Sequence, residues 1–207
     1  MNDTPKSSAP ERLTNYKHVN LFLSELHTNH GPVPWIFASR KNAPGASLDT
    51  PDAAVIIAVM TDRGEPRLVV IREYRAPLRH YEISAPSGLV DAGETIIAAA
   101  KRELREETGL ELIRVAHVSP PLPSSAGLTD ETVSLVYVEA SGAVSRAHQT
   151  EHEDIEVILL SLDDVRQLLS RPSGALISSR LYPVLLGYVS AGVISLPSEI
   201  SQKQSQP

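Results

Sequence analysis

The chain has 207 residues, which is enough for one well-formed core or for one domain with a small appendage. Apolar residues make up 42 % and charged residues 21 %, as is usual for a soluble globular protein. The net charge of −6 argues against general binding to nucleic acids or anionic membranes, and leaves room for a local basic pocket. The absence of cysteine excludes disulfides, thiolate metal sites and cysteine nucleophiles.

The ends of the chain are polar. The N-terminal sequence MNDTPKSSAPERLTNYK lacks the apolar middle of a signal peptide, and no apolar run reaches the roughly 18 residues of a membrane span. We therefore expect a cytoplasmic protein with no membrane partner. Residues 1–16 are rich in proline, serine and charge and are expected to be loose, as is the tail SEISQKQSQP.

Apolar patterning predicts strands first, then a helix, more strands and two final helices. In chain order the expected elements are a strand or short helix at 18–26, strands at 33–41, 53–61 and 67–75, a helix at 96–107, strands at 110–118, 131–140 and 154–161, and helices at 161–170 and 175–192. Pro183 predicts a kink in the last helix. This order is typical of an α+β fold with a mixed sheet and not of a regular βαβ alternation.

The segment GLVDAGETIIAAAKRELREETGL, residues 88–110, reads as a loop followed by a helix. Thr95 can act as the N-cap, since its hydroxyl can accept from an unpaired amide of the first turn. Gly109 stands where a left-handed residue commonly ends a helix. An apolar stripe is expected to anchor the helix on the sheet, formed by Ile97, Ala100 and Leu104.

Three glutamates lie close together on this helix. Glu103, Glu106 and Glu107 follow at i, i+3 and i+4, so they share one face and repel one another. A hard divalent cation would resolve this repulsion, because Mg²⁺ prefers oxygen ligands and commonly adds substrate phosphates. The alternative is an acidic helix face that simply points into solvent.

The full spacing favours the metal site. The pattern is Gly, five residues, Glu, seven residues, Arg-Glu-apolar, one residue, Glu-Glu, one residue and Gly-apolar, formed by Gly88, Glu94, Arg102, Glu103, Leu104, Glu106, Glu107, Gly109 and Leu110. All nine positions match the Nudix box, so the chain resembles a Nudix hydrolase. The resemblance implies an α/β/α sandwich with a mixed sheet, and cleavage of a nucleoside diphosphate linked to another moiety with Mg²⁺ or Mn²⁺ as cofactor. It also implies three parts: a β-rich extension at 1–50, the Nudix domain at 51–200 and a disordered tail at 201–207.

The resemblance also assigns roles to single residues. It implies that Glu103 and Glu107 are the main metal ligands, and that the Ser87 carbonyl offers a further one. Glu106 would serve a second or third ion. Arg102 would hold and orient a glutamate, which places Arg102 and Glu106 among the catalytic residues. Glu94 would have a structural or supporting role.

The flanks of the box resemble those of ADP-ribose pyrophosphatases. In VVIREYRAP, Arg75 corresponds to an arginine that contacts substrate phosphate in that group; the alternative is an ordinary surface residue of a strand. The stretch SAPSG resembles the Glu-x-Pro-Ala-Gly entry to the box. Here Ser84 replaces the usual glutamate, and the nearest acid, Glu82, comes two residues earlier.

Two segments after the box continue the resemblance. In PSSAGLTDE, residues 123–131, Ala126 stands where the group has proline, Pro123 is displaced by three residues, and Glu131 matches an acid. In TEHEDIEV, residues 150–157, the resemblance implies that Glu151 or Glu153 is the catalytic base. The alternative for these two acids is a charged turn before a strand.

The N-terminal region carries the last candidates. Trp35 and Arg40 lie where these enzymes stack an aromatic on adenine and pack across a dimer, so both are candidate substrate contacts together with Arg75 and Glu131. A lone tryptophan is more often a core residue, which is the alternative for Trp35. Residues 18–41 carry much apolar surface for a free arm, which predicts a homodimer.

These patterns leave three functions open. The leading hypothesis is metal-dependent hydrolysis of ADP-ribose or a related nucleoside diphosphate sugar to a nucleoside monophosphate and a sugar phosphate. The second is a Nudix hydrolase for another substrate, such as GDP-mannose, a dinucleotide or NADH. The third is a nucleotide-sensing module, which the intact set of box glutamates disfavours.

Overall fold

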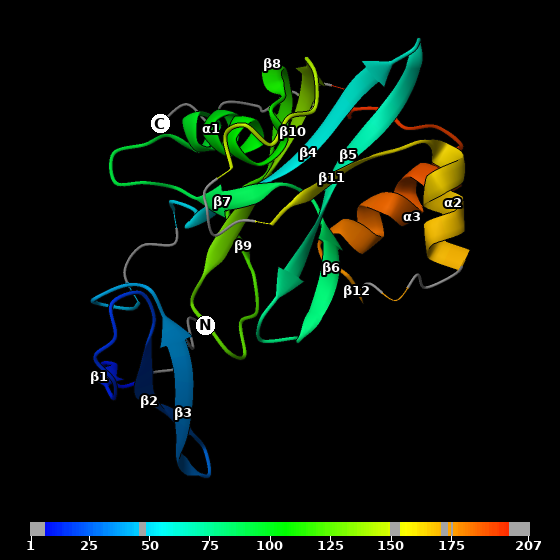
Figure 1. Cartoon of the computed structure of the whole chain (residues 1–207). Coiled ribbons are helices and arrows are strands. Elements are labelled where there is room, and N and C mark those ends of the chain that lie inside the picture. Colours follow the sequence, from blue (N-terminus) through cyan, green and yellow to red (C-terminus); the bar gives the residue numbers. More distant parts are fainter. Residues whose placement is uncertain (1–6, 46–48, 150–153, 171–173, 175, 199–207) are drawn as a thin grey trace, which may run out of the picture. The chain divides into compact units, whose positions relative to one another are not determined.

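The computed structural model describes residues 7–45, 49–149, 154–170, 174 and 176–198 (Figure 1). The chain divides into two compact units, one made of residues 1–52 and 120–133, the other of residues 53–119 and 134–207. Each unit therefore combines segments that are distant in the sequence.

The first unit contains a three-stranded antiparallel sheet in the order β1-β2-β3, with β1 at Glu11–Arg12, β2 at Asn20–Thr28 and β3 at Gly31–Ser39. The segment at 18–26, which the sequence left open between strand and helix, is thus a strand. The described part of residues 1–16 is not loose, because β1 pairs with β2 and the Asn20 side chain forms two hydrogen bonds with the Tyr16 backbone. In the same unit, β9 (Leu122–Pro123) pairs with the first residues of β10.

The strands that follow form a nine-stranded mixed sheet within the described ranges, with the path β12-β6-β5-β4-β10-β8. Three further strands pair outside this path: β11 with β5, β7 with β4 and β9 with β10. Its strands are β4 (Ala53–Asp62), β5 (Glu65–Arg75), β6 (His80–Ser84), β7 (Ser87–Leu89), β8 (Glu111–Val118), β9, β10 (Thr132–Ser141), β11 (Glu156–Leu160) and β12 (Leu176–Ile177). The strand β12 runs parallel to β6, whereas β5 runs antiparallel to β4, β6 and β11. The expected α+β fold with a mixed sheet is confirmed.

Helices cover both faces of this sheet. The helix α1 (Ile96–Thr108) packs on one face, where Val136 and Val138 of β10 join its core. The alternate β10 residues Leu135 and Tyr137 point to the other face, where they border α3 (Leu181–Ala191). Because neighbouring residues of a strand point to opposite faces, α1 and α3 lie on opposite sides of the sheet. This is the layered arrangement that the sequence predicts.

The helix α1 begins and ends as its sequence predicts. The Thr95 hydroxyl accepts from the Ala98 amide at 3.2 Å, and Gly109 ends the helix with φ of 76°. The predicted apolar stripe is partly wrong: Ala100 and Leu104 are fully buried, but Ile97 is 45 % exposed, and Ala99 is buried in its place. The buried face is therefore centred one residue further along the helix.

The C-terminal region differs most from expectation. The helix α2 (Leu162–Ser170) forms as predicted, but α3 begins at Leu181 and not at residue 175, and Leu176–Ile177 forms β12. Pro183 therefore lies in the first turn, where a helix tolerates proline because the amide there has no intrahelical partner. A kink at Pro183 is thus not needed.

Candidate active site

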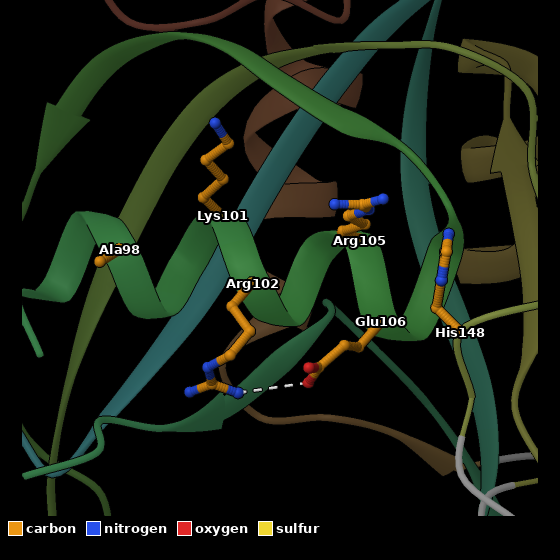
Figure 2. Close-up of a pocket in the computed structure, with 6 residues that line it drawn as sticks. All are labelled: Ala98, Lys101, Arg102, Arg105, Glu106 and His148. Carbon is orange, nitrogen blue, oxygen red and sulfur yellow. Dashed lines mark hydrogen bonds and ion pairs between the residues drawn. The ribbon is translucent and has the colours of Figure 1, made fainter.

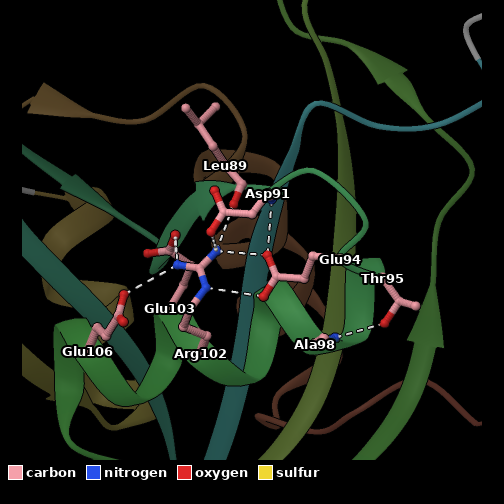
Figure 3. A network of polar contacts seen from close by, with 8 residues as sticks. All are labelled: Leu89, Asp91, Glu94, Thr95, Ala98, Arg102, Glu103 and Glu106. Carbon is pink, nitrogen blue, oxygen red and sulfur yellow. Dashed lines mark hydrogen bonds and ion pairs between the residues drawn. The ribbon is translucent and has the colours of Figure 1, made fainter.

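Arg102 is the centre of a polar network that joins the loop before α1 to the helix itself (Figure 3). Its Nε and Nη2 donate to the two carboxylate oxygens of Glu94 at 3.1 and 2.9 Å, and Nη2 also donates to the Leu89 carbonyl at 2.9 Å. Its Nη1 donates to Glu103 at 2.6 Å and to Glu106 at 3.3 Å. One guanidinium therefore fixes the loop and two glutamates of the box.

The charges in this network stabilise one another. Hydrogen bonds from Arg102 and from the Asp91 amide lower the pKa of Glu94 below its ordinary value. The same pairing with Glu94 and Glu103 raises the pKa of Arg102. At neutral pH the network therefore holds an arginine cation between carboxylates, and part of the repulsion among the box glutamates is relieved without a metal.

Gly88 is required where it stands because Glu103 occupies the space beside it. A Cβ at residue 88 would lie 1.8 Å from the carboxylate carbon of Glu103. Gly88 belongs to β7, which pairs with β4 at Ala54, so its backbone position is fixed by the sheet. The missing side chain thus allows the Glu103 carboxylate to lie against the strand before the helix.

Glu107 is held differently from its neighbours. It is only 7 % exposed, and its Oε2 accepts the Ser87 amide at 2.9 Å. Glu106, by contrast, has a side chain that is 46 % exposed. The three glutamates therefore lie in three environments: one against β7, one bonded to the strand backbone and one beside solvent.

Oxygen donors of this kind suit a hard divalent cation. The carboxylates of Glu103 and Glu107 both lie against β7, at Gly88 and Ser87 respectively, and the glycine keeps the space beside Glu103 free of a side chain. Among the described residues, however, no three acidic or imidazole groups converge as a ready-made metal site. The backbone contact observed at this point is made by the Ser87 amide, and the role of the Ser87 carbonyl as a metal ligand stays a prediction.

A depression of about 550 Å³ lies on the outer side of α1 (Figure 2). Lys101 and Arg105 project to one side of the helix, whereas Arg102 and Glu106 project to the other. His148 reaches the same depression from the segment after β10. The Arg102–Glu106 ion pair thus lies on the side of α1 away from Lys101 and Arg105.

Arg75 is paired with two carboxylates. Its Nη1 lies 2.8 Å from Glu73, and its Nε donates to Glu82 at 3.1 Å, across the β5–β6 pair. Glu82, the acid that comes two residues before the expected position, thus orients Arg75. Ser84 itself is buried, and its hydroxyl has no hydrogen-bond partner in the described structure.

The remaining candidates lie in the first unit or outside the described residues. Trp35 lies on β3 and is 44 % exposed, so it is not a core residue. The Arg40 Nε donates to Glu131 at 3.3 Å, which joins two predicted substrate contacts. Glu151 and Glu153, the candidate bases, lie outside the described residues.

Some contacts of the site were not predicted. The Leu89 carbonyl and the Asp91 amide complete the network around Arg102 and Glu94, and backbone groups leave no signal in side-chain patterns. Gln149 donates to the Glu107 carbonyl from 42 residues away, a contact that sequence spacing cannot reveal. No described helix has the length and apolar character needed to cross a membrane.

Comparison with known proteins agrees with this geometry. An ADP-ribose pyrophosphatase of Bacillus subtilis is 25 % identical over 165 residues, covering 79 % of this chain and 82 % of that protein. An ADP-ribose pyrophosphatase of Saccharomyces cerevisiae is 36 % identical over 127 residues, covering 60 % of this chain and 54 % of that protein. The chain thus spans about half the length of the yeast relative, and an alignment with a Caenorhabditis elegans relative likewise covers 51 % of that protein.

A comparison with solved structures shows a similar fold. The crystal structure of an ADP compounds hydrolase matches with a TM-score of 0.63 at 19 % identity, over 92 % of this chain and 97 % of that one. At that identity the match shows the fold alone. The model of the NUDIX domain matches residues 50–183, which include the whole network around Arg102. The chain therefore belongs to the Nudix family.

Proposed function

We propose that this protein hydrolyses the pyrophosphate bond of ADP-ribose or of a related nucleoside diphosphate sugar, giving a nucleoside monophosphate and a sugar phosphate. The observation that carries the proposal is the arrangement of the box glutamates, with Glu103 placed against Gly88 and Glu107 bonded to the Ser87 amide. Relatives named ADP-ribose pyrophosphatase support the choice of substrate class.

Nudix proteins typically use divalent metal ions, and the donors here fit Mg²⁺ or Mn²⁺. Glu103, Glu107 and the Ser87 carbonyl would hold the metal, with Glu106 as a further ligand. When bound, it would neutralise the charge of the pyrophosphate and lower the pKa of a water molecule. Arg102 keeps Glu103 and Glu106 oriented, so removing Arg102 would disorder both glutamates at once.

The reaction itself is a displacement by water. The water oxygen forms a bond to one phosphorus, the bond from that phosphorus to the bridging oxygen breaks, and the departing phosphate keeps the bridging oxygen. A side chain must accept the proton of the attacking water. We assign this role to Glu151 or Glu153, and replacing each by glutamine should lower kcat if it is the base.

The remaining candidate residues would contact the substrate. Arg75 offers a cation to the substrate phosphates, with Glu73 and Glu82 holding its guanidinium in place. The Trp35 ring is open to solvent and can stack on a base, a use of an aromatic face that tolerates different bases. Arg40 and Glu131, which form an ion pair, would contact the substrate at the same end as Trp35.

A phosphate-release assay tests the activity. The protein would be incubated with Mg²⁺, a coupling phosphatase and a panel of ADP-ribose, GDP-mannose, UDP-glucose, NADH, diadenosine polyphosphates and nucleoside triphosphates. Glu107→Gln is the inactive variant, and Glu139→Gln, an exposed acid on β10, is the matched control. We expect turnover of ADP-ribose that is lost in Glu107→Gln and kept in Glu139→Gln.

Other outcomes of this assay would redirect the proposal. Preferred turnover of GDP-mannose, a dinucleotide or NADH would keep the chemistry and move the question of specificity to Ser84 and Ala126. Ser84 makes this second substrate class worth testing, because its buried hydroxyl has no described partner. Tight nucleotide binding without turnover of any compound would contradict the hydrolase and favour a sensing module.

We also propose that the protein is a homodimer. On β3, Val33 and Trp35 lie on one face of the strand and are 43 and 44 % exposed, and Ile36 lies on the opposite face and is 56 % exposed. A second copy of the chain would remove apolar surface of this strand from water. Light scattering at micromolar concentration tests the assembly, and a monomeric mass would contradict it.

A further inference from the structure

The C-terminal end of α1 is held by the segment at residues 145–149. The last carbonyls of a helix lack partners within the helix. Here the Ser145 amide donates to the Thr108 carbonyl at 2.9 Å. A Cβ at Gly109 would lie 2.7 Å from the Ser145 nitrogen, so this segment packs directly against the end of the helix.

Gln149 extends this contact to the next strand. Its Nε2 donates to the Glu107 carbonyl at 2.9 Å and to the Ile155 carbonyl at 3.1 Å. A carboxamide nitrogen carries two hydrogens, and both are used here. Ile155 is itself only 1 % exposed and comes directly before β11. One side chain therefore joins the end of the box helix to the beginning of a core strand.

We propose that Gln149 is a positioning residue for the hydrolysis proposed above. It acts on the reaction through Glu107, because it bonds the main chain of this residue while the Glu107 carboxylate accepts the Ser87 amide. Fixing the Glu107 main chain at the end of α1 keeps its carboxylate in place beside β7.

Two variants test this role. Gln149→Ala removes both hydrogen bonds, and Gln149→Glu keeps the size of the side chain but turns an acceptor towards two carbonyl oxygens. Gln167→Ala is the matched control, since Gln167 lies exposed on α2. We expect kcat on the substrate found by the panel to fall about 10- to 100-fold in both Gln149 variants, because small misplacements of reacting groups have effects of this size. KM should change less than about threefold, because the substrate contacts are elsewhere.

A second readout does not depend on turnover. Hydrogen exchange measured by mass spectrometry should show faster exchange, by about tenfold, at the end of α1 and the beginning of β11 in both variants. Unchanged kcat in the folded Gln149 variants, or a loss of activity that follows only the unfolded fraction, would overturn the role. Unchanged exchange with an active wild type would also overturn it. A wild type that hydrolyses no compound of the panel would instead overturn the proposed function, and the positioning role with it.

Discussion

Gly88 shows how a single missing side chain shapes the site. The nearest atoms to a Cβ at this position belong to the flexible end of Glu103 and not to the backbone. In Gly88→Ala the Glu103 carboxylate would have to move away from β7, while the packing of the core would stay unchanged. We therefore expect kcat to fall at least about tenfold, with a change of less than about 1 kcal/mol in the free energy of unfolding.

Steady-state kinetics and denaturant unfolding of Gly88→Ala measure the two effects. The control is Gly187→Ala on α3, where an added Cβ meets no atom within 4 Å. Equal activity in both variants would show that the position of Glu103 is not needed. A large loss of stability in Gly88→Ala would show instead that the strand, and not the carboxylate, has been disturbed.

Glu94 makes a prediction about pH. Its pKa is lowered by Arg102 from an ordinary value of 4.5, so the folded state favours the ionised carboxylate. A carboxylate of this kind stabilises the fold above the pKa of the unfolded state, and this contribution is lost as the pH falls through the folded-state pKa. Glu94→Gln should therefore be less stable than the wild type at pH 7.

Urea unfolding of both proteins between pH 7 and pH 3 checks this prediction. The difference in free energy of unfolding should narrow once the pH falls below 4.5, the ordinary pKa of the carboxyl. A difference that stays constant across this range would mean that the charge of Glu94 does not contribute, and that the two hydrogen bonds from Arg102 act independently of ionisation.

At the scale of single residues, local spacing predicts more than distant contacts. The shared face of Glu103, Glu106 and Glu107 follows from helical geometry, and the helix forms there. The pairing of Arg102 with Glu94 across eight residues extends the same local segment. The bond from Gln149 to the Glu107 carbonyl spans 42 residues, and nothing in either local sequence indicates it. The supports of the site are thus less predictable than its box glutamates.

The elements show the same contrast. The helix α1 is predicted well because its N-cap, its helix-forming residues and its terminal glycine agree. The short strands β6 and β7 are missed because HYEIS alternates over only five residues and SGL has only three, and the sheet provides their partners from β5 and β4. The early part of the predicted last helix fails for a similar reason, since β12 pairs with β6.

Gly187 allows a test of stability at the level of one helix. It lies inside α3, where glycine is less favourable than alanine by about 0.5–1 kcal/mol because of its larger backbone entropy in the unfolded chain. It has no positive φ, and the space around its Cα is open. Gly187→Ala should therefore raise the free energy of unfolding by up to about 1 kcal/mol in denaturant titrations. A lower stability would contradict this, and would mean that the open space beside α3 is occupied in solution.

At the scale of the whole molecule, the first unit is built from two separate segments. The Ala38 amide donates to the Leu128 carbonyl at 2.8 Å, and Asp52 Oδ2 accepts the Thr132 amide at 2.8 Å. Residues 120–133 thus join the N-terminal strands within one compact unit. A single sequence boundary after residue 50 cannot separate this unit from the rest of the chain, because the hydrogen bond between Asp52 and Thr132 joins residues that are 80 positions apart.

The exposed apolar side chains of β3 lead to the prediction about assembly. Ile36 is 56 % exposed although it lies in the middle of β3. If a second copy covers this surface, a lysine at residue 36 would have to be desolvated in the dimer but would be harmless in the monomer. Ile36→Lys should therefore lower the mass measured by analytical ultracentrifugation from that of a dimer towards 22.4 kDa.

Val144→Lys, which changes a single exposed apolar residue outside this unit, should keep the dimer mass. Dissociation by both variants would indicate a general effect of added charge, and a dimer that survives Ile36→Lys would place the contact on another surface.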